Sequence, residues 1–374
     1  MRVLHVGKFY PPAPGGMERV VQLLCENERP EVDSVVLAAN TSPHTVREVW
    51  HGVPVTRVAS VASIGSVGIC PTFPAVLART PRDITVIHEP NPAALVSDWI
   101  TRGRGPLVVW FHSEVVRARW KYNILYRPFL RRALTRADRI VVSSPRLADH
   151  ARELADFRRK CVVIPFGIDV ERLEATPAVT ARAAQIVAEH PGPRVLFIGR
   201  LVPYKGVDVL IDAMASVPRA TALILGDGPL RGELAARAAA SGVAGRVRFL
   251  GALPDAEVVA HLHACDVFVL PSVSRQETFG VAQLEAMACG RPVVSTDLET
   301  GVPWVNQHEV TGLVVPPGNS ERLSDALGTL LSDEALRNRL GAAARERVER
   351  EFTTERMAQR TVSLYRDVLA GATC

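Results

Sequence analysis

Residues 275–292 read RQETFGVAQLEAMACGRP and place two glutamates eight positions apart, Glu277 and Glu285. Polar residues surround Glu277 and predict a loop, whereas the apolar pattern of residues 279–288 predicts a helix. The Gly-Arg-Pro that follows is a usual helix stop signal. We therefore expect Glu277 before the helix and Glu285 on it.

The start of this helix has the features of an anion site. If the helix begins near Gly280, its first N–H groups and its dipole favour a negative group there. Glu285 then lies about 7.5 Å further along the axis, at about 1.5 Å per residue. One short unit can thus hold a polyol, a phosphate and a second polyol in a row, which is the order of groups in a sugar nucleotide.

The segment resembles the Glu-x7-Glu signature of the retaining GT-B glycosyltransferases of family 4. The resemblance implies that Glu277 contacts hydroxyls of the transferred sugar and that Glu285 holds the ribose. It also implies that Gly280 and Val281, after Phe279, give backbone N–H groups to the diphosphate. The fold that it implies is GT-B, in which two Rossmann-like domains face each other across a deep cleft and the C-terminal helix returns to the N-terminal domain.

Apolar runs rich in Val, Ile and Leu recur along the chain in two series. The first series comprises residues 3–6, 35–38, 53–58, 84–87, 107–110, 140–142 and 162–164, and the second comprises residues 195–198, 222–225, 247–250, 267–270, 293–294 and 313–315. Because the runs are continuous rather than alternating, they predict strands covered on both faces and hence parallel sheets. Two consecutive series of this α/β kind imply two Rossmann-like domains.

The domain boundaries follow from a polar, Ala-rich interval near residues 172–192 and from a helix start near residue 353. We expect an N-terminal domain at 1–172, joined by a returning helix at about 353–374, and a C-terminal domain at 173–352. By the resemblance, the first domain binds the acceptor and the second binds the nucleotide-sugar donor.

Two cations, Arg200 and Lys205, follow the first expected strand of the second domain and are five residues apart. Both can converge on one diphosphate across a turn, and they match the Arg-x4-Lys pair of the family. No two aspartates stand at positions i and i+2, so the Asp-x-Asp metal site of many other transferases is missing. Because cations and helix N–H groups can stabilise a leaving diphosphate electrostatically, we expect no metal and no cofactor.

The resemblance assigns roles to residues at three further places. Gly15 and Gly16, in the turn after the first strand, correspond to the loop that approaches the diphosphate and the acceptor. His112, at the end of a buried strand, corresponds to a histidine beside the reacting sugar. Leu253 lies where the family frames the nucleotide base through its backbone.

Several of these residues also have ordinary structural explanations. A Gly-Gly turn or a histidine at a strand end often has a purely structural role. For His88 we expect either a structural role in the cleft or a contact with the acceptor. With those alternatives stated, the candidate catalytic residues are His112, Glu277, Arg200 and Lys205.

Residues 99–139 combine positive charge with aromatic side chains. Against Glu114 and Asp138 stand ten basic residues, Arg102, Arg104, Arg117, Arg119, Lys121, Arg127, Arg131, Arg132, Arg136 and Arg139. The net positive charge of this segment is larger than the formal net charge of +5 of the whole chain. Basic and aromatic residues together suit an anionic membrane surface or a phosphorylated lipid, and the alternative is a solvated helix whose aromatic side chains face the core. No RNA- or DNA-binding motif accompanies the charge, so we expect no nucleic acid partner.

Location and redox state follow from simple patterns. The N-terminus reads as a buried strand without the pattern of a signal peptide, and the weakly charged stretch 58–78 is interrupted by Gly and Pro. We therefore expect no transmembrane segment and a cytoplasmic protein, peripheral at the inner face of the plasma membrane. The six cysteines are scattered without a Cys-x-x-Cys pair, which predicts buried thiols.

The resemblance, which covers nearly the whole chain, implies a retaining glycosyltransferase that moves a sugar from a nucleoside-diphosphate sugar to a glycan or polyprenyl-diphosphate-linked acceptor. GDP-mannose is the first choice of donor, because residues 88–92 and 110–114 look like those of bacterial mannosyltransferases of surface polysaccharide and lipopolysaccharide assembly. One alternative is a GT-B sugar-nucleotide epimerase. Another is a catalytically silent subunit that binds a nucleotide sugar and recruits a partner. A nicotinamide-dependent dehydrogenase would need a glycine fingerprint that the chain lacks.

Overall fold

The computed structural model describes residues 1–13, 15–64, 67–103, 105–114, 124 and 126–371. The chain divides into two compact units. Unit 1 comprises Met1–Gly167 together with Thr354–Cys374, and unit 2 comprises Ile168–Thr353. The chain therefore passes from unit 1 to unit 2 after Gly167, a few residues before the boundary at residue 172 that the sequence analysis predicted.

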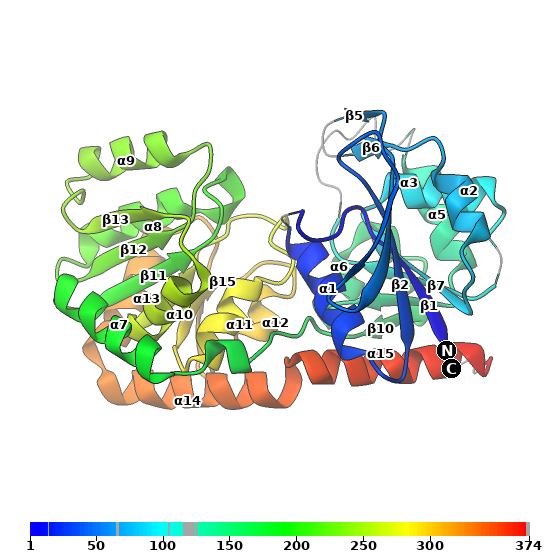
Figure 1. Cartoon of the computed structure of the whole chain (residues 1–374). Coiled ribbons are helices and arrows are strands. Elements are labelled where there is room, and N and C mark those ends of the chain that lie inside the picture. Colours follow the sequence, from blue (N-terminus) through cyan, green and yellow to red (C-terminus); the bar gives the residue numbers. More distant parts are fainter. Residues whose placement is uncertain (14, 65–66, 104, 115–123, 125, 372–374) are drawn as a thin grey trace. The chain divides into compact units, whose positions relative to one another are not determined.

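Unit 1 is built on an eight-stranded sheet in the order β10-β9-β8-β7-β1-β2-β4-β3 (Figure 1). Its strands are β1 (Arg2–Val6), β2 (Asp33–Ala39), β3 (Val46–Trp50), β4 (Val53–Val58), β7 (Ile84–Glu89), β8 (Leu107–Phe111), β9 (Arg139–Val142) and β10 (Cys161–Val163), beside a separate hairpin of β5 (Ala62–Ile64) and β6 (Val67–Ile69). All neighbours in the large sheet are parallel except β3 and β4. Every apolar run that the sequence analysis took as a strand of this region is a strand.

The edge strand β3 and the hairpin escaped the sequence analysis. Val49 in β3 is 70% exposed, and the strand pairs antiparallel with β4 at the edge of the sheet. An edge strand with one face in water does not form a continuous apolar run. The criterion used for buried parallel strands therefore cannot detect it.

Helices enclose this sheet and include one from the end of the chain. They are α1 (Gly16–Asn27), α2 (Phe73–Arg79), α3 (Pro92–Ile100), α5 (Arg127–Arg136), α6 (Pro145–His150) and α15 (Thr354–Leu369). The last of them packs on α1, its fully buried Tyr365 lies against His5, and Arg366 pairs with Glu31. The expected return of the C-terminal helix to the N-terminal domain is confirmed.

Unit 2 contains a six-stranded, fully parallel sheet in the order β13-β12-β11-β14-β15-β16. Its strands are β11 (Arg194–Ile198), β12 (Thr221–Leu225), β13 (Val247–Gly251), β14 (Val267–Leu270), β15 (Val293–Thr296) and β16 (Gly312–Val315). Numbered within the unit, this order is 3-2-1-4-5-6, the doubly wound Rossmann order. The helices are α7 (Pro177–Glu189), α8 (Val207–Ala213), α9 (Arg231–Ala240), α10 (Asp255–Ala264), α11 (Val281–Ala288), α12 (Val302–Val305), α13 (Ser320–Ser332) and α14 (Glu334–Glu351).

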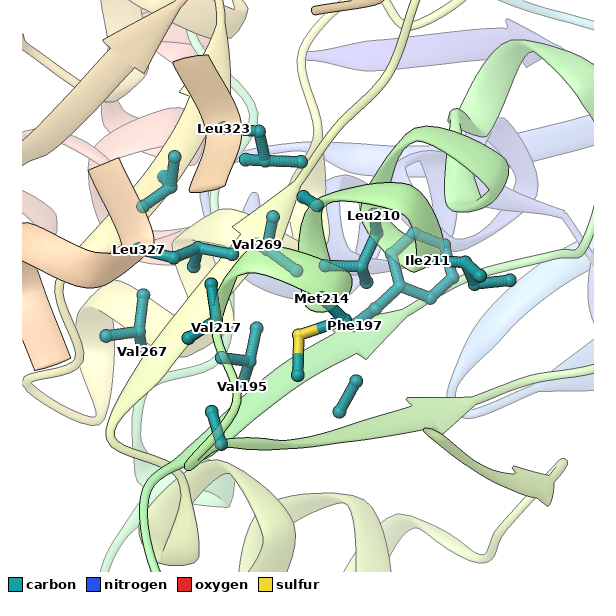
Figure 2. Packing of buried hydrophobic residues seen from close by; sticks show 14 of the residues in the cluster. Val195, Phe197, Leu210, Ile211, Met214, Val217, Val267, Val269, Leu323 and Leu327 are labelled. Carbon is teal, nitrogen blue, oxygen red and sulfur yellow. The ribbon is translucent and has the colours of Figure 1, made fainter. Parts of the chain in front are cut away.

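The core of unit 2 explains why its strands read as continuous apolar runs. Figure 2 shows Val195 and Phe197 of β11 and Val269 of β14 among side chains of the covering helices, including Leu210 of α8 and Leu327 of α13. All five are fully buried. Because helices cover the sheet in this way, the strands need apolar residues at successive positions.

Among the described residues, no helix is both long enough and apolar enough to cross a membrane. Cys25, Cys70, Cys265 and Cys289 are buried free thiols, and Cys161 is a half-buried one, which agrees with the prediction of thiols rather than disulfides. Cys374 lies outside the described residues.

Candidate active site

The strand order of unit 2 reverses between β11 and β14, and the loops that follow these two strands carry half of the predicted donor-site residues. In open parallel sheets, ligands bind at the carboxyl ends of the strands where the order reverses. The loop after β11 contains Arg200 and Lys205, and the loop after β14 contains Glu277. Sheet topology therefore brings together segments that are more than seventy residues apart in sequence.

Lys205 and Glu277 form an ion pair at this position. Lys205 Nζ lies 2.6 Å from Glu277 Oε2, and the two side chains are only 12% and 10% exposed. Ser272 Oγ donates a hydrogen bond to the same carboxylate oxygen at 2.9 Å. The carboxylate is thus held from two sides in a largely desolvated place, where charge interactions are stronger than in water.

The two loops are tied together by backbone contacts. Val273 N–H donates to the carbonyl of Tyr204 at 2.8 Å. Next to Lys205, Gly206 adopts a φ of 65°, and a Cβ there would lie 2.0 Å from the carbonyl oxygen of Pro271. Only glycine allows this approach, so Gly206 sets the short distance between the loop of Lys205 and the loop of Glu277.

Helix α11 begins where the sequence analysis expected it. Gly280 is its N-cap with a φ of 74° and a ψ of 62°, and within the described residues no side chain caps the amino end. A Cβ on Gly280 would lie 2.5 Å from Leu270 Cδ2, at the end of β14. The first N–H groups of a helix have no intrahelical acceptor, so the turn at Gly280 presents the N–H of Val281 as a donor at the amino end.

Phe279 anchors this turn from the inside. Its ring is 1% exposed and packs edge-on against Phe352 and at a tilt against Trp304. Gln283, one turn into α11, donates through Nε2 to the Phe279 carbonyl at 2.6 Å. The aromatic ring is therefore part of the core of unit 2, and its effect on the site is to hold the backbone of the Gly280 turn.

Glu285 lies on α11 and pairs with Arg172, a residue that the sequence analysis did not single out. Arg172 belongs to a short 3-10 helix (Glu171–Leu173), and its guanidinium lies 2.5 Å from Glu285 Oε1 and 3.0 Å from Asp255 Oδ2. Burial disfavours the charge of Arg172, but the two carboxylates outweigh it and raise the pKa of the guanidinium. No local pattern links position 172 to position 285, and only the fold brings them together.

The remaining predicted residues of unit 2 lie nearby in the chain but make fewer contacts. Arg200 is exposed in the loop after β11, and among the described residues its guanidinium forms no ion pair. The convergence of Arg200 and Lys205 on one diphosphate stays a prediction. Leu253 is half-buried between β13 and α10, in the loop that follows a third strand of the same sheet.

In unit 1, the strand order reverses between β1 and β7, and the predicted residues follow these strands and β8. Gly15 and Gly16 end the loop after β1, with Gly16 opening α1. A Cβ on Gly16 would meet nothing within 4 Å, whereas one on Gly15 would lie 1.9 Å from Oε2 of the buried Glu18. Contacts within the described chain therefore do not explain Gly16.

His112 directly follows β8 and is 5% exposed. Its backbone N–H donates to the carbonyl of Glu89 at 3.0 Å, and its Nε2 lies 2.9 Å from Nδ1 of His88. Burial lowers the pKa of His112 to about 3, so the ring is neutral near pH 7. Its other nitrogen, Nδ1, is buried and has no hydrogen-bond partner among the described residues.

Glu89, at the end of β7, is a second buried polar group that the sequence analysis did not single out. Oε2 accepts hydrogen bonds from the N–H of Asn91 at 3.0 Å and from the hydroxyl of Tyr126, whereas Oε1 has no partner among the described residues. Burial raises its pKa to about 7, against the effect of the two hydrogen bonds. A carboxyl group that titrates near neutral pH is characteristic of functional sites.

Part of the basic segment 99–139 lies in the described residues, and some of its arginines are held in ion pairs. Arg131 pairs with Asp156 at 2.7 Å, and Arg136 pairs with the buried Asp98 at 2.6 Å. Arg127 and Arg132 on α5 are exposed. Arg104, Arg117, Arg119 and Lys121 lie outside the described residues.

No group of three or more His, Cys, Asp or Glu side chains in the described part of the chain is arranged to hold a metal ion.

Comparison with known proteins finds a family match for each part of the chain. Residues 14–172 match the family described as Glycosyltransferase Family 4, and residues 181–347 match the family described as Glycosyl transferases group 1. The chain is 35% identical to the D-rhamnosyltransferase WbpZ of Pseudomonas aeruginosa over 360 residues, which are 94% of this chain and 92% of that protein. It is 32% identical to the O-antigen chain mannosyltransferase C of Escherichia coli, with 99% of each chain covered.

Among solved structures, the sucrose-phosphate synthase of Thermosynechococcus elongatus is similar, with a TM-score of 0.81 at 23% identity over 99% of this chain and 100% of that one. This similarity and the two sheets, one mainly and one fully parallel, confirm the expected α/β fold with two Rossmann-like domains.

Proposed function

This chain belongs to glycosyltransferase family 4, and from that membership we propose that it transfers mannose from a nucleoside-diphosphate sugar, GDP-mannose in the first place, to a glycan or lipid-linked acceptor with retention of configuration. The observation that carries the proposal is the ion pair of Lys205 and Glu277 at the strand-order reversal of unit 2, beside the amino end of α11. These groups provide a cation, a carboxylate and helix N–H groups at one place.

Each part of this arrangement suits one part of a nucleotide sugar. The N–H groups at Gly280 and Val281, with Lys205 and the exposed Arg200, donate to the diphosphate and stabilise the charge that develops as it departs. Because these donors neutralise the leaving group, the transfer that we propose is metal-independent. Glu277 accepts hydrogen bonds from hydroxyls of the transferred sugar.

The nucleoside is held on the other side of the α11 turn. Glu285, oriented by Arg172, accepts hydrogen bonds from the ribose hydroxyls. The backbone near Leu253 frames the base, and the ring of Phe279 maintains the turn from within the core. In unit 1, Gly15, Gly16 and His112 lie at the carboxyl edge of its own sheet, and we propose that they contact substrate groups there. Retention is explained by attack on the face from which the phosphate departs, with that phosphate helping to deprotonate the acceptor.

The choice of mannose and of a surface-glycan acceptor is supported by the name of the Escherichia coli relative, an O-antigen chain mannosyltransferase, whereas the name of the Pseudomonas aeruginosa relative gives D-rhamnose as the sugar. A lipid-linked acceptor is supported by exposed groups on unit 1. Trp99 and Ile100, at the end of α3, are 49% and 54% exposed, and Trp99 packs edge-on against Phe129 of α5. Exposed Arg127 and Arg132 also lie on α5, so we call these two helices with their exposed residues the α3–α5 face. Cations and aromatic side chains together favour the anionic surface of a membrane.

The first test of the proposal is thermal stabilisation of the protein by a panel of GDP-, UDP-, ADP- and dTDP-sugars, with nicotinamide dinucleotide as a control. A ligand at about 100 times its dissociation constant adds about 2.7 kcal/mol, which is visible as a raised midpoint. We expect stabilisation by one nucleotide class, with GDP-mannose the strongest, and its loss in Glu285→Ala. No stabilisation by any sugar nucleotide contradicts the proposal.

A second measurement separates transfer from its alternatives. Release of the nucleoside diphosphate should occur only when an acceptor is supplied. An epimerase would convert the donor without acceptor, and a silent binding subunit would bind the donor and release nothing.

A further inference from the structure

A chain of three buried histidines crosses the sheet of unit 1 and ends at a buried glutamate. His112 Nε2 lies 2.9 Å from His88 Nδ1, and His88 Nε2 lies 3.1 Å from His5 Nδ1. His5 Nε2 in turn lies 3.2 Å from Oε2 of Glu28, which directly follows α1. The three histidines belong to the neighbouring strands β1 and β7 and to the end of β8. We call these four residues the histidine chain.

The histidine chain is enclosed by aromatic rings. His5 and His88 are fully buried, and their rings stack on each other at a centroid distance of 5.4 Å. The ring of His112 stacks on Trp110 at 5.9 Å and on Phe166 at 5.4 Å. In so enclosed a place the protonation of each ring nitrogen is decided by its protein partner.

The hydrogen bonds of the histidine chain all run in one direction. Burial lowers the pKa of His88 well below its usual value and that of His112 to about 3, so these rings are neutral near pH 7. A neutral imidazole donates through one nitrogen and accepts through the other. Once the direction of one bond in the row is set, all the others follow.

Glu28 sets that direction. Oε2 of Glu28 accepts a hydrogen bond from Ser34 Oγ at 2.9 Å, so it acts as an acceptor in this row. A neutral His5 ring then donates to Oε2 through Nε2 and accepts at Nδ1. The same assignment passes to His88 and on to His112, which leaves Nδ1 of His112 with a lone pair and no proton.

At the His112 end of the histidine chain, a hydrogen-bond partner can come from outside the protein. Nδ1 of His112 is buried and has no hydrogen-bond partner among the described residues. Buried polar atoms in folded proteins nearly always have a partner, and one without needs an explanation. A bound ligand that donates a hydrogen bond provides it.

We infer that Glu28, acting through His5 and His88, holds His112 in the tautomer that accepts a hydrogen bond at Nδ1 from a hydroxyl group of the bound substrate. Glu28, His5 and His88 are positioning residues, and His112 alone touches the substrate. That the hydroxyl belongs to a sugar rests on the proposed function, whereas the tautomer does not. A substrate analogue with an ether or a fluorine in place of this hydroxyl would face a lone pair and bind less well.

The tautomer is measured directly by NMR on the full chain labelled with ¹⁵N-histidine, in long-range ¹H–¹⁵N correlation spectra near pH 7. In the wild type we expect the proton on Nε2 and none on Nδ1 for the three chain histidines. Ser34→Ala is the matched control, because it removes a donor to Glu28 and leaves the acceptor of the chain in place. Its spectra should show the same tautomers.

Glu28→Leu removes the acceptor, and we expect His112 to gain a population with its proton on Nδ1. If this variant does not fold, Glu28→Gln replaces it, because its amide can donate to His5 and reverse the row. A proton on Nδ1 of His112 in the wild type would overturn the inference. An unchanged His112 tautomer in the folded Glu28 variant would overturn it equally.

Kinetics give the functional readout. In the Glu28 variant we expect kcat/KM to fall roughly tenfold, since a hydroxyl of the bound substrate then meets a donor rather than an acceptor. Ser34→Ala should keep the kcat/KM of the wild type. Equal kcat/KM in both variants would overturn the catalytic part of the inference. If the wild type transfers no sugar, the proposed function fails, and the NMR spectra still decide whether Glu28 sets the tautomer of His112.

Discussion

The ammonium group of Lys205 lies 2.6 Å from Oε2 of Glu277, and the two residues come from different loops at the carboxyl edge of the second sheet. In the free protein each charge therefore neutralises the other. In the function that we propose, Lys205 turns to the diphosphate and Glu277 to the sugar when a donor binds, and both side chains start from largely buried positions.

Replacing either member of this pair should affect binding and transfer together. Lys205→Ala should weaken donor binding about tenfold or more, because a hydrogen bond to a charged group contributes about 1.5–3 kcal/mol. Glu277→Ala should abolish transfer in a protein that remains folded, and the double variant should lose little beyond the worse single one. Calorimetric titration and a transfer assay measure these changes. Arg322→Ala is the control, since its pair with Asp325 is 67% and 61% exposed. Full activity in either single variant would refute the assigned roles.

Arg172 is expected to act on the donor through Glu285. Arg172→Ala leaves the carboxylate on α11 without the guanidinium that orients it, so the KM for the donor should rise about tenfold, as for loss of one charge-assisted hydrogen bond. The value of kcat should change less, because the ribose is remote from the reacting bond. The matched control is Arg182→Ala, which breaks the pairs with Glu257 and Glu189 away from the site. Equal effects of the two variants would show that Arg172 has only a structural role.

Gly280→Ala should disturb both the fold and the donor site. The substituted residue would have to keep a φ of 74°, with its Cβ 2.5 Å from Leu270 Cδ2. Left-handed backbone of this kind in a non-glycine residue costs about 1–3 kcal/mol, and a shift of the turn would misplace the N–H of Val281. Gly232→Ala in α9 is the control, because nothing lies within 4 Å of a Cβ there. That variant should be neutral or stabilised by about 0.5–1 kcal/mol in chemical denaturation. A Gly280→Ala protein as stable as the wild type would contradict the geometry.

The buried carboxyl of Glu89 should make stability depend on pH. Its pKa is raised by burial from 4.5 to about 7, so the folded protein retains a proton that the unfolded chain releases. Unfolding free energy should therefore fall as the pH rises from 4.5 to 7, by about 3 kcal/mol from this group, and level off above that.

In Glu89→Gln the side chain has no carboxyl proton to release, and its amide oxygen can still accept hydrogen bonds from Asn91 and Tyr126. Relative to the wild type, the variant should gain stability between pH 4.5 and pH 7. Denaturation curves at several pH values test this, and a stability difference that does not vary with pH would exclude a raised pKa at Glu89.

The α3–α5 face should bind anionic vesicles through its exposed arginines. Arg127→Ser with Arg132→Ser should weaken binding by about 2 kcal/mol, at about 1 kcal/mol for each basic residue near an anionic surface. Arg131 and Arg136 are unsuitable for this test, because each is already paired with a carboxylate, that of Asp156 and that of Asp98.

The control for this test carries the same change of charge elsewhere, as Arg219→Ser with Arg339→Ser, two exposed positions in unit 2. Vesicle sedimentation at low salt gives the comparison. If both double variants bind alike, the face is a solvated surface.

Much of the fold could be predicted because it depends on local periodicity. Val195 to Ile198 and Val267 to Leu270 read as continuous apolar runs because both faces of their strands are buried. The helix after Gly280 could be located for the same kind of reason, from its apolar spacing and its Gly-Arg-Pro end. The strand β3 could not, since it lies at an edge of the sheet and all of its residues are exposed or half-buried.

The sequence by itself determined which residues bear charge and on which kind of element each one lies: Glu277 in a loop, Glu285 on a helix, and Lys205 just after a strand. Only the tertiary structure decided their partners. Lys205 meets Glu277, Arg172 meets Glu285, and His5, His88 and His112 line up in one row, because the order of parallel strands places distant loops at a common edge. That order depends on how whole helices and strands pack, and no short stretch of sequence carries it.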